Sequence, residues 1–114
     1  MKSTEWWRQT AQHMWRSYFV LKKKQEDGSF GKDMTYAEQN TYEMCDKVFS
    51  EKFVRPDQEI LTMYFTSRWG DDLYAVEDYS LKHNIPTKVI WIVIRRANRL
   101  VMEEAGLLDR KEED

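Results

Sequence analysis

The sequence predicts an all-α protein of about five helices. Apolar residues recur at spacings of three and four along most of the chain, and turn-forming residues are scarce, with four glycines and two prolines. Hydrophobic residues make up 41% and aromatic residues 14% of the 114 residues, enough for one domain with one core. We therefore expect a single helical domain over 1–114, with an N-terminal helical pair packed against a C-terminal three-helix unit.

The first helix is expected over 3–28. Ser3 or Thr4 can cap its start, and Gly28 can end it. Its apolar face carries residues spaced by three and four, which are Trp7, Ala11, Met14, Tyr18 and Leu21. For Trp6, Trp7 and Trp15, packing in the core is favoured over a ligand platform. For the lysines at 22–24, a solvated helix end is favoured over a phosphate clamp.

The next two helices are expected over 35–53 and 55–69, after a loop at 26–34 that contains two glycines. Thr35 and Glu38 have the spacing of a capping box, and Pro56 suits the first turn of a helix. The apolar stripe of the first segment comprises Ala37, Thr41, Met44 or Cys45, and Val48 or Phe49. The stripe of the second comprises Ile60, Leu61, Tyr64 and Phe65. Because Cys45 lies within a stripe, a buried inert thiol is favoured over a nucleophile.

Two more helices are expected at 71–84 and 86–106. Asp71 or Asp72 can cap the former, Pro86 can start the latter, and Gly106 can end it. The remaining residues, 107–114, are mostly charged, so we expect them to fray.

The segment "DYSLKHNIPTKVIWIVIRRANRL" has the outline of a helix-turn-helix, in which two helices cross steeply around a short turn. Ile85 would fill the turn, and Ser80 supplies a small residue on the first helix. Pro86 and Thr87 would begin the second helix. Its buried stripe would comprise Val89 or Ile90, Val93 or Ile94, Ala97, and Leu100 or Val101.

The opposite face of this second helix would hold Thr87, Lys88, Trp91, Ile92, Arg95, Asn98 and Arg99. Four cations and no acid lie between 86 and 102, and a cationic stripe of this kind is what phosphate binding requires. We predict a DNA contact made by Thr87, Lys88, Trp91, Arg95, Asn98 and Arg99. The first three would reach base edges, whereas Arg95 and Arg99 would meet phosphates. Two other interpretations of "VIWIVI" stay open: a core helix contacted on nearly all sides, and a dimer or partner surface.

These residues resemble a known family. The run "NIPTKVIWIVIRRANRL" looks like the second half of the helix-turn-helix in bacterial sigma factor region 4, on the strength of Ile85, Pro86, Val89, Ile90, Arg96, Ala97 and Leu100. The preceding "RPDQEILTMYF" is similar to the helix before that motif, so the resemblance covers 55–106. Departures from the pattern are Ser80 for alanine, Asn84 for glycine, and Trp91, Ile92 and Val93 for polar groove-facing residues. In length and order of parts the chain resembles phage-encoded regulators of the RinA and ArpU kind, which implies activation of late phage transcription.

Several function classes are not expected. No phosphate-binding glycine loop, nucleophile elbow or histidine pair at metal-ligand spacing occurs, so we expect neither an enzyme nor a bound metal or cofactor. The acidic group Asp71, Asp72, Glu77 and Asp78 could bind a cation or act as acid and base, but a catalytic role is not favoured because Asp71 and Asp72 are expected to cap a helix. One cysteine, no export signal and no apolar run of about 20 residues favour the cytoplasm of a bacterial host, away from membranes.

We therefore expect a phage or prophage transcription regulator that binds double-stranded DNA, alone or alongside RNA polymerase, as a monomer or as a homodimer. The net charge of −2 means that this prediction depends on local charge and not on bulk charge. The alternative is a small, non-enzymatic helical interaction or dimerisation module of phage origin that does not bind DNA. It would use Trp91 and Ile92 as its contact surface.

Overall fold

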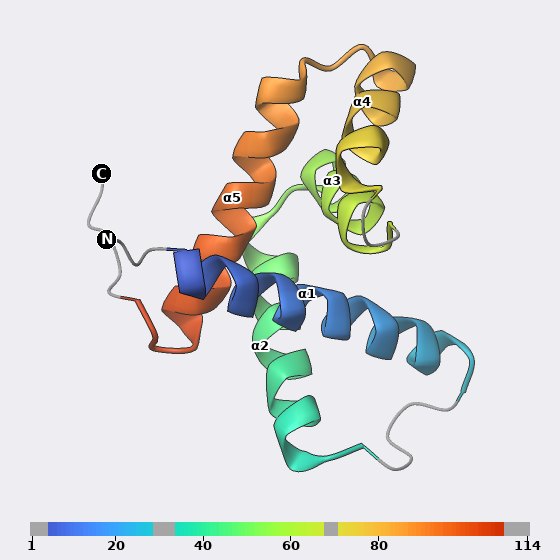
Figure 1. Cartoon of the computed structure of the whole chain (residues 1–114). Coiled ribbons are helices and arrows are strands. Elements are labelled where there is room, and N and C mark those ends of the chain that lie inside the picture. Colours follow the sequence, from blue (N-terminus) through green and yellow to red (C-terminus); the bar gives the residue numbers. More distant parts are fainter. Residues whose placement is uncertain (1–4, 29–33, 68–70, 109–114) are drawn as a thin grey trace.

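The computed structural model describes residues 5–28, 34–67 and 71–108. Within these ranges the chain forms five α-helices and no β-strand, which confirms the predicted all-α class. The helices are α1 (Glu5–Glu26), α2 (Tyr36–Lys52), α3 (Arg55–Phe65), α4 (Asp72–His83) and α5 (Thr87–Glu104) (Figure 1). The predicted cap at Ser3 or Thr4 and the end of the tail beyond residue 108 lie outside the described residues, as do residues 29–33 of the loop.

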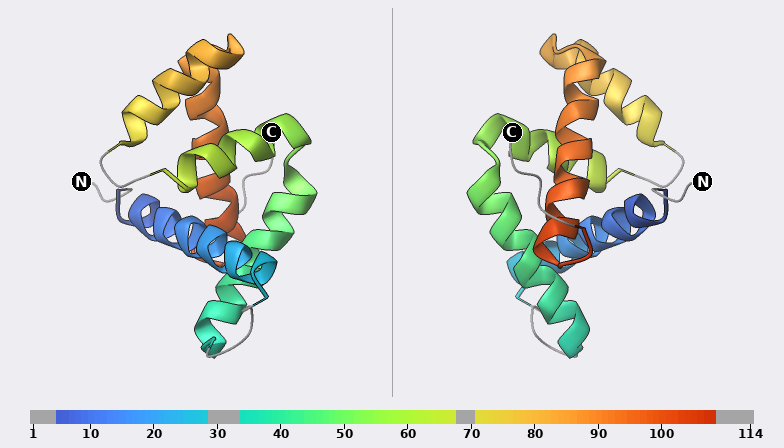
Figure 2. Two further views of the ribbon diagram at one scale, coloured as in Figure 1. Left: turned by 90° about the vertical axis from the view of Figure 1, so that its right-hand side faces the viewer. Right: turned by 90° about the vertical axis from the view of Figure 1, so that its left-hand side faces the viewer.

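Helix α5 is the central element, because it packs against each of the other four helices. In Figures 1 and 2, α4 and α5 form an inverted V that is closed at the top by the turn between them. Helix α1 crosses the opposite end of α5 and packs on α2. The N-terminal half of α5 therefore lies away from the α1–α2 pair.

The core centres on Trp15, which is completely buried. Its ring stacks on Phe65 with centroids 5.8 Å apart and meets Tyr18 edge-on at 5.7 Å. Its indole Nε1 donates a hydrogen bond of 3.0 Å to the carbonyl oxygen of Ala97 in α5. A buried indole N–H requires such a partner, so this bond fixes how α1 sits on α5.

The three tryptophans of α1 have different environments. Trp15 is buried and Trp7 is half-buried, but Trp6 is exposed, so the core expected for all three is wrong for Trp6. Trp15 follows Trp6 by nine positions, and at 100° per residue this places them on opposite faces of the helix. Ala37, at the start of the predicted stripe of α2, is also exposed.

The starts of α2 to α5 follow the sequence signals in three of four cases, and Pro86 directly precedes α5 as expected. Thr35 accepts a hydrogen bond of 3.1 Å from the backbone N–H of Glu38, whose side chain accepts one of 3.0 Å from the N–H of Thr35, as a capping box requires. Pro56 lies in the first turn of α3. Asp71 occupies the cap position of α4 but makes no capping side-chain hydrogen bond, which differs from the expected role.

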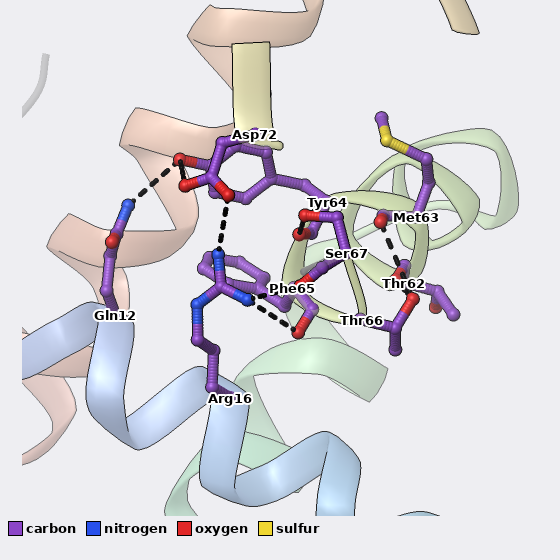
Figure 3. A network of polar contacts seen from close by, with 9 residues as sticks. All are labelled: Gln12, Arg16, Thr62, Met63, Tyr64, Phe65, Thr66, Ser67 and Asp72. Atoms are coloured by element: carbon purple, nitrogen blue, oxygen red, sulfur yellow. Dashed lines mark hydrogen bonds and ion pairs between the residues drawn. The ribbon is translucent and has the colours of Figure 1, made fainter. Parts of the chain in front are cut away.

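A polar network joins α1 to the start of the α4–α5 unit (Figure 3). The guanidinium of Arg16 donates to the carbonyl oxygens of Phe65 and Ser67, at 3.4 and 2.8 Å, and pairs with Asp72 at 3.3 Å. The hydroxyl of Tyr64 accepts a bond of 3.0 Å from Gln12 and donates one of 3.4 Å to Asp72. Because α1 binds both the end of α3 and the start of α4, the network fixes the position of the first turn of α4 in the fold.

Candidate nucleic-acid interface

The turn between α4 and α5 sets the position of the candidate interface. Asn84 ends α4 in the left-handed conformation, with φ 56° and ψ 46°, and its N–H donates to the carbonyl oxygen of Ser80. The N–H of Ile85 donates to the same oxygen at 3.1 Å, and the hydroxyl of Ser80 donates to the carbonyl oxygen of Ile85. Ile85 packs against the core as predicted, whereas the hydrogen bond of the Ser80 hydroxyl is a contact that the prediction of a small residue there did not include.

The inner face of α5 holds the helix in the fold. It comprises Ile90, Val93, Ile94, Ala97, Val101 and Met102, all of them buried. The run "VIWIVI" therefore divides between two faces: Ile90, Val93 and Ile94 are buried, whereas Val89 is 43% and Ile92 is 46% exposed. The interpretation as a helix covered on nearly all sides is wrong, because α5 meets its neighbours along one stripe only.

The outer face of α5 is basic and partly apolar. It comprises Lys88, Val89, Ile92, Arg95 and Arg96, all of them exposed. From one turn to the next its members are three or four residues apart, so their side chains follow one side of the helix. Helix α5 carries no acid before Glu103, and the cations of this face lie between Lys88 and Arg96, a span of about two and a half turns. Hereafter we call these five residues the α5 outer face.

Three of the predicted contact residues lie open to solvent, namely Thr87, Lys88 and Arg95. Two others, Trp91 and Arg99, make contacts within the chain itself. Trp91 is half-buried, with its ring edge-on against Tyr64 of α3 at 5.6 Å. Arg99 is half-buried, and its Nε lies 2.9 Å from a carboxylate oxygen of Glu103. Trp91 is therefore better suited to hold α5 in place than to reach a ligand.

Asn98 does not belong to the interface, which corrects the prediction. It is only 5% exposed, and its Oδ1 is buried without a hydrogen-bond partner among the described residues. It lies four residues after Ile94 and three before Val101, so the helical repeat places it on the buried stripe. A count of helical positions from these two neighbours could have found this from the sequence.

Arg96 and Val89 are members of the outer face that the site prediction left out. The guanidinium of Arg96 lies over the ring of Phe53, 4.9 Å from its centroid, which holds the side chain in a defined direction. Arg96 follows Ile92 by four residues, and this spacing was the available signal. Val89 was one of two candidates for the stripe, and the structure buries Ile90 instead.

Other places in the described residues offer less chemistry. An open groove of about 550 Å³ is lined by Lys22, Phe49, Arg55, Gln58, Glu59, Thr62 and Met63, and the hydroxyl of Thr62 donates to the carbonyl oxygen of Gln58 at 2.9 Å. Burial raises the pKa of the Cys45 thiol, so the thiol stays protonated and inert, as expected. No group of three or more His, Cys, Asp or Glu in the described ranges could hold a metal ion.

No protein-family model, curated protein or solved structure matches this chain. The resemblance of residues 55–106 to sigma factor region 4 therefore stays a prediction, as does the likeness to RinA and ArpU regulators. Among the described helices, none combines the length and apolar character needed to cross a membrane.

Proposed function

We propose that the protein is a DNA-binding transcription regulator of phage or prophage origin that reads double-stranded DNA through α5. The observation that carries the proposal is the α5 outer face, a basic row exposed along a helix that a three-residue turn joins to α4. This is the arrangement in which a second helix can enter the major groove. Late-gene activation, an action alongside RNA polymerase and a site in the bacterial cytoplasm rest on the sequence resemblance alone.

The positions along α5 suggest separate roles. Thr87 and Lys88 lie at the exposed N-terminal end, where groove-reading helices meet base edges. Ile92, one turn further, can contact a thymine methyl group, which is an apolar feature of the major groove. Arg95 and Arg96 lie further along and are suited to phosphates.

Salt dependence tests the proposal. Replacing both Lys88 and Arg95 with Ala should remove one base contact and one phosphate contact, and the lost phosphate contact should lower the slope of log affinity against log salt by about 0.9. Fluorescence anisotropy with duplex DNA between 50 and 300 mM salt, on the order of the physiological range, measures this slope. Both side chains are exposed, so the helical circular-dichroism signal should be unchanged.

The matched control is the same double change at Lys23 of α1 and Lys52 of α2, two exposed lysines outside the α5 outer face. This control should retain the wild-type slope. If wild-type protein binds no duplex from the host or the phage in a salt-sensitive way, DNA binding is excluded.

A second function is favoured by a different observation, the exposure of Val89 and Ile92 beside the cations. An interaction module that does not bind DNA would use these side chains against a protein partner. The same anisotropy measurement separates the two functions, because such a module shows no salt-sensitive affinity for DNA.

A further inference from the structure

Helix α4 carries an apolar and acidic face that no part of the described chain covers. Leu73, Tyr74 and Leu81 are 68%, 73% and 84% exposed, and Glu77 lies exposed between them. At 100° per residue the four side chains fall within about one third of the helix circumference. We call these four residues the α4 outer face. Exposed apolar groups that cluster on one helix face indicate a contact surface.

This surface is unsuited to DNA. Glu77 belongs to it, and Asp78 is exposed beside it, so phosphates would be repelled. Lys82 is the cation nearest to it in sequence, and this side chain already pairs with Asp78 at 3.2 Å. The chemistry of the α4 outer face instead fits a basic surface that also carries apolar side chains.

The α5 outer face has that chemistry. It pairs cations with Val89 and Ile92, whereas the α4 outer face pairs an acid with Leu73, Tyr74 and Leu81. Both faces contain a row that advances in steps of four residues, through 73, 77 and 81 on α4 and through 88, 92 and 96 on α5. Rows of this kind interlock when two helices pack.

The order of side chains in the two rows also matches. If the helices run antiparallel, setting Leu81 against Ile92 places Glu77 against Arg96. If they run parallel, the same apolar contact places Glu77 against Lys88. Either direction joins an apolar pair to an opposite-charge pair, the combination that gives an interface both affinity and register.

We propose that two copies of this chain associate by placing the α4 outer face of each on the α5 outer face of the other. A second copy is the occupant because one chain supplies both complementary faces, so a two-fold dimer forms the contact twice. The dimer covers the basic row of α5 and shields it from DNA. This regulatory half of the inference rests on the proposed function, whereas the self-association does not.

Competition between the two states follows from linkage. DNA binds only the monomer, so DNA must weaken dimerisation by the same factor by which dimerisation weakens DNA binding. Raising the protein concentration should convert the regulator into a dimer that does not bind DNA, and adding duplex DNA should dissociate this dimer.

Charge reversal tests the dimer, with sedimentation equilibrium as the measurement. Glu77→Lys should weaken the wild-type dimer about tenfold or more, since it sets like charges against each other. Of Lys88→Glu and Arg96→Glu, the one that faces Glu77 in the dimer should act likewise. Combining Glu77→Lys with one of them should restore the dimer to within about threefold, and the one that restores it identifies the helix direction.

The control is Tyr36→Asp in α2, which changes an apolar side chain of similar exposure outside both faces. It should leave dimerisation unchanged, whereas Leu81→Asp should abolish it. A wild-type chain that stays monomeric up to about 1 mM would overturn the inference. So would a dimer that neither reversed pair restores.

Duplex DNA separates this inference from the proposed function. Titrating the wild-type dimer with duplex DNA should release monomers on DNA, and Glu77→Lys should bind the duplex at least as tightly as the wild type. A stable complex of an intact dimer with DNA would refute the competition. If the wild-type chain binds DNA but does not dimerise, only the inference is contradicted. If it dimerises but does not bind DNA, only the proposed function is contradicted.

Discussion

At the residue scale, two buried groups that carry protons, the Tyr18 hydroxyl and the Cys45 thiol, lie close together in the core. The hydroxyl of Tyr18 donates a hydrogen bond of 2.7 Å to Asp46, and the thiol of Cys45 lies 3.7 Å from the carbonyl oxygen of Met14. Burial raises the pKa of both groups, and the carboxylate of Asp46 raises both further. Both groups therefore keep their protons in the folded state under conditions in which the unfolded chain loses them.

This makes stability sensitive to alkali. In the unfolded chain, cysteine and tyrosine ionise near pH 8.5 and about pH 10. The contribution of the two groups to the free energy of unfolding is therefore complete below about pH 8.5 and falls as the pH rises further. Urea unfolding between about pH 8 and 10.5 should show this decline, with a shallower slope in Cys45→Ala and Tyr18→Phe. Tyr36→Phe, at an exposed position, should decline as the wild type does. Identical slopes in all four proteins would contradict the explanation.

Single residues also show where sequence reasoning succeeded and failed. The buried positions Ile60, Leu61, Tyr64 and Phe65 followed from spacing, and the structure confirms all four. Asn98 was misplaced because a polar side chain was assigned to solvent although its helical position faces the core. The contact of Trp91 with Tyr64 could not be predicted, because spacing within one helix does not say which neighbour covers it.

At the scale of the element, the α4–α5 turn depends on one backbone conformation. Asn84 has a positive φ, which Asn tolerates better than most residues and glycine tolerates best. Its side chain is exposed, so the cost of replacing it comes mainly from the backbone.

We expect Asn84→Ala to lower the free energy of unfolding by about 1 kcal/mol, and Asn84→Gly to leave it within about 0.5 kcal/mol. Gly106 follows α5 with φ 77°, and a methyl group at its Cα would meet no atom within 4 Å, so Gly106→Ala should cost a similar amount through the backbone alone. Urea unfolding measures all three. A larger loss for Asn84→Gly than for Asn84→Ala would show that the side chain, and not the backbone, matters.

Element boundaries were largely predictable from the sequence. The ends of the predicted segments 35–53, 71–84 and 86–106 lie within a few residues of the ends of α2, α4 and α5. Capping residues, prolines and glycines mark those ends in the sequence. The third helix was predicted to run to 69, but α3 ends at Phe65. Thr66 and Ser67 turn their hydroxyls onto carbonyl oxygens of the last turn, a local competition that apolar spacing does not reveal.

At the scale of the whole molecule, Arg16 links the N-terminal pair to the α4–α5 unit. Its side chain is 13% exposed, and its guanidinium donates to Phe65 of α3, to Ser67 just after α3 and to Asp72 of α4. Its partner Asp72 is 56 residues away along the chain, so no local pattern could predict the pair. The sequence thus predicted the helices and most of their inner faces, but not the polar contacts that orient them.

Removing this link should loosen α4 before the rest of the fold. Arg16→Met should lower the free energy of unfolding by about 2–3 kcal/mol, because Asp72 and two carbonyl groups lose a charged donor. Arg16→Lys should rescue little, since an ammonium group cannot reach all three acceptors. Hydrogen exchange should accelerate in α4 more than in α2.

Lys23→Met provides the comparison, because Lys23 is exposed on the same helix. It should change stability by no more than about 0.5 kcal/mol. Uniform acceleration of exchange through α2 and α4 in Arg16→Met would mean that the arginine stabilises the core in general and does not specifically hold α4.

Helix α5 packs against every other helix through one side and faces solvent through the other. Substitutions on the solvent side can alter what the protein recognises while the scaffold stays intact, and substitutions on the packed side alter the scaffold first. Binding specificity can thus be re-engineered at Lys88, Ile92 and Arg95 without redesigning the packing at Ile90, Ile94 and Ala97.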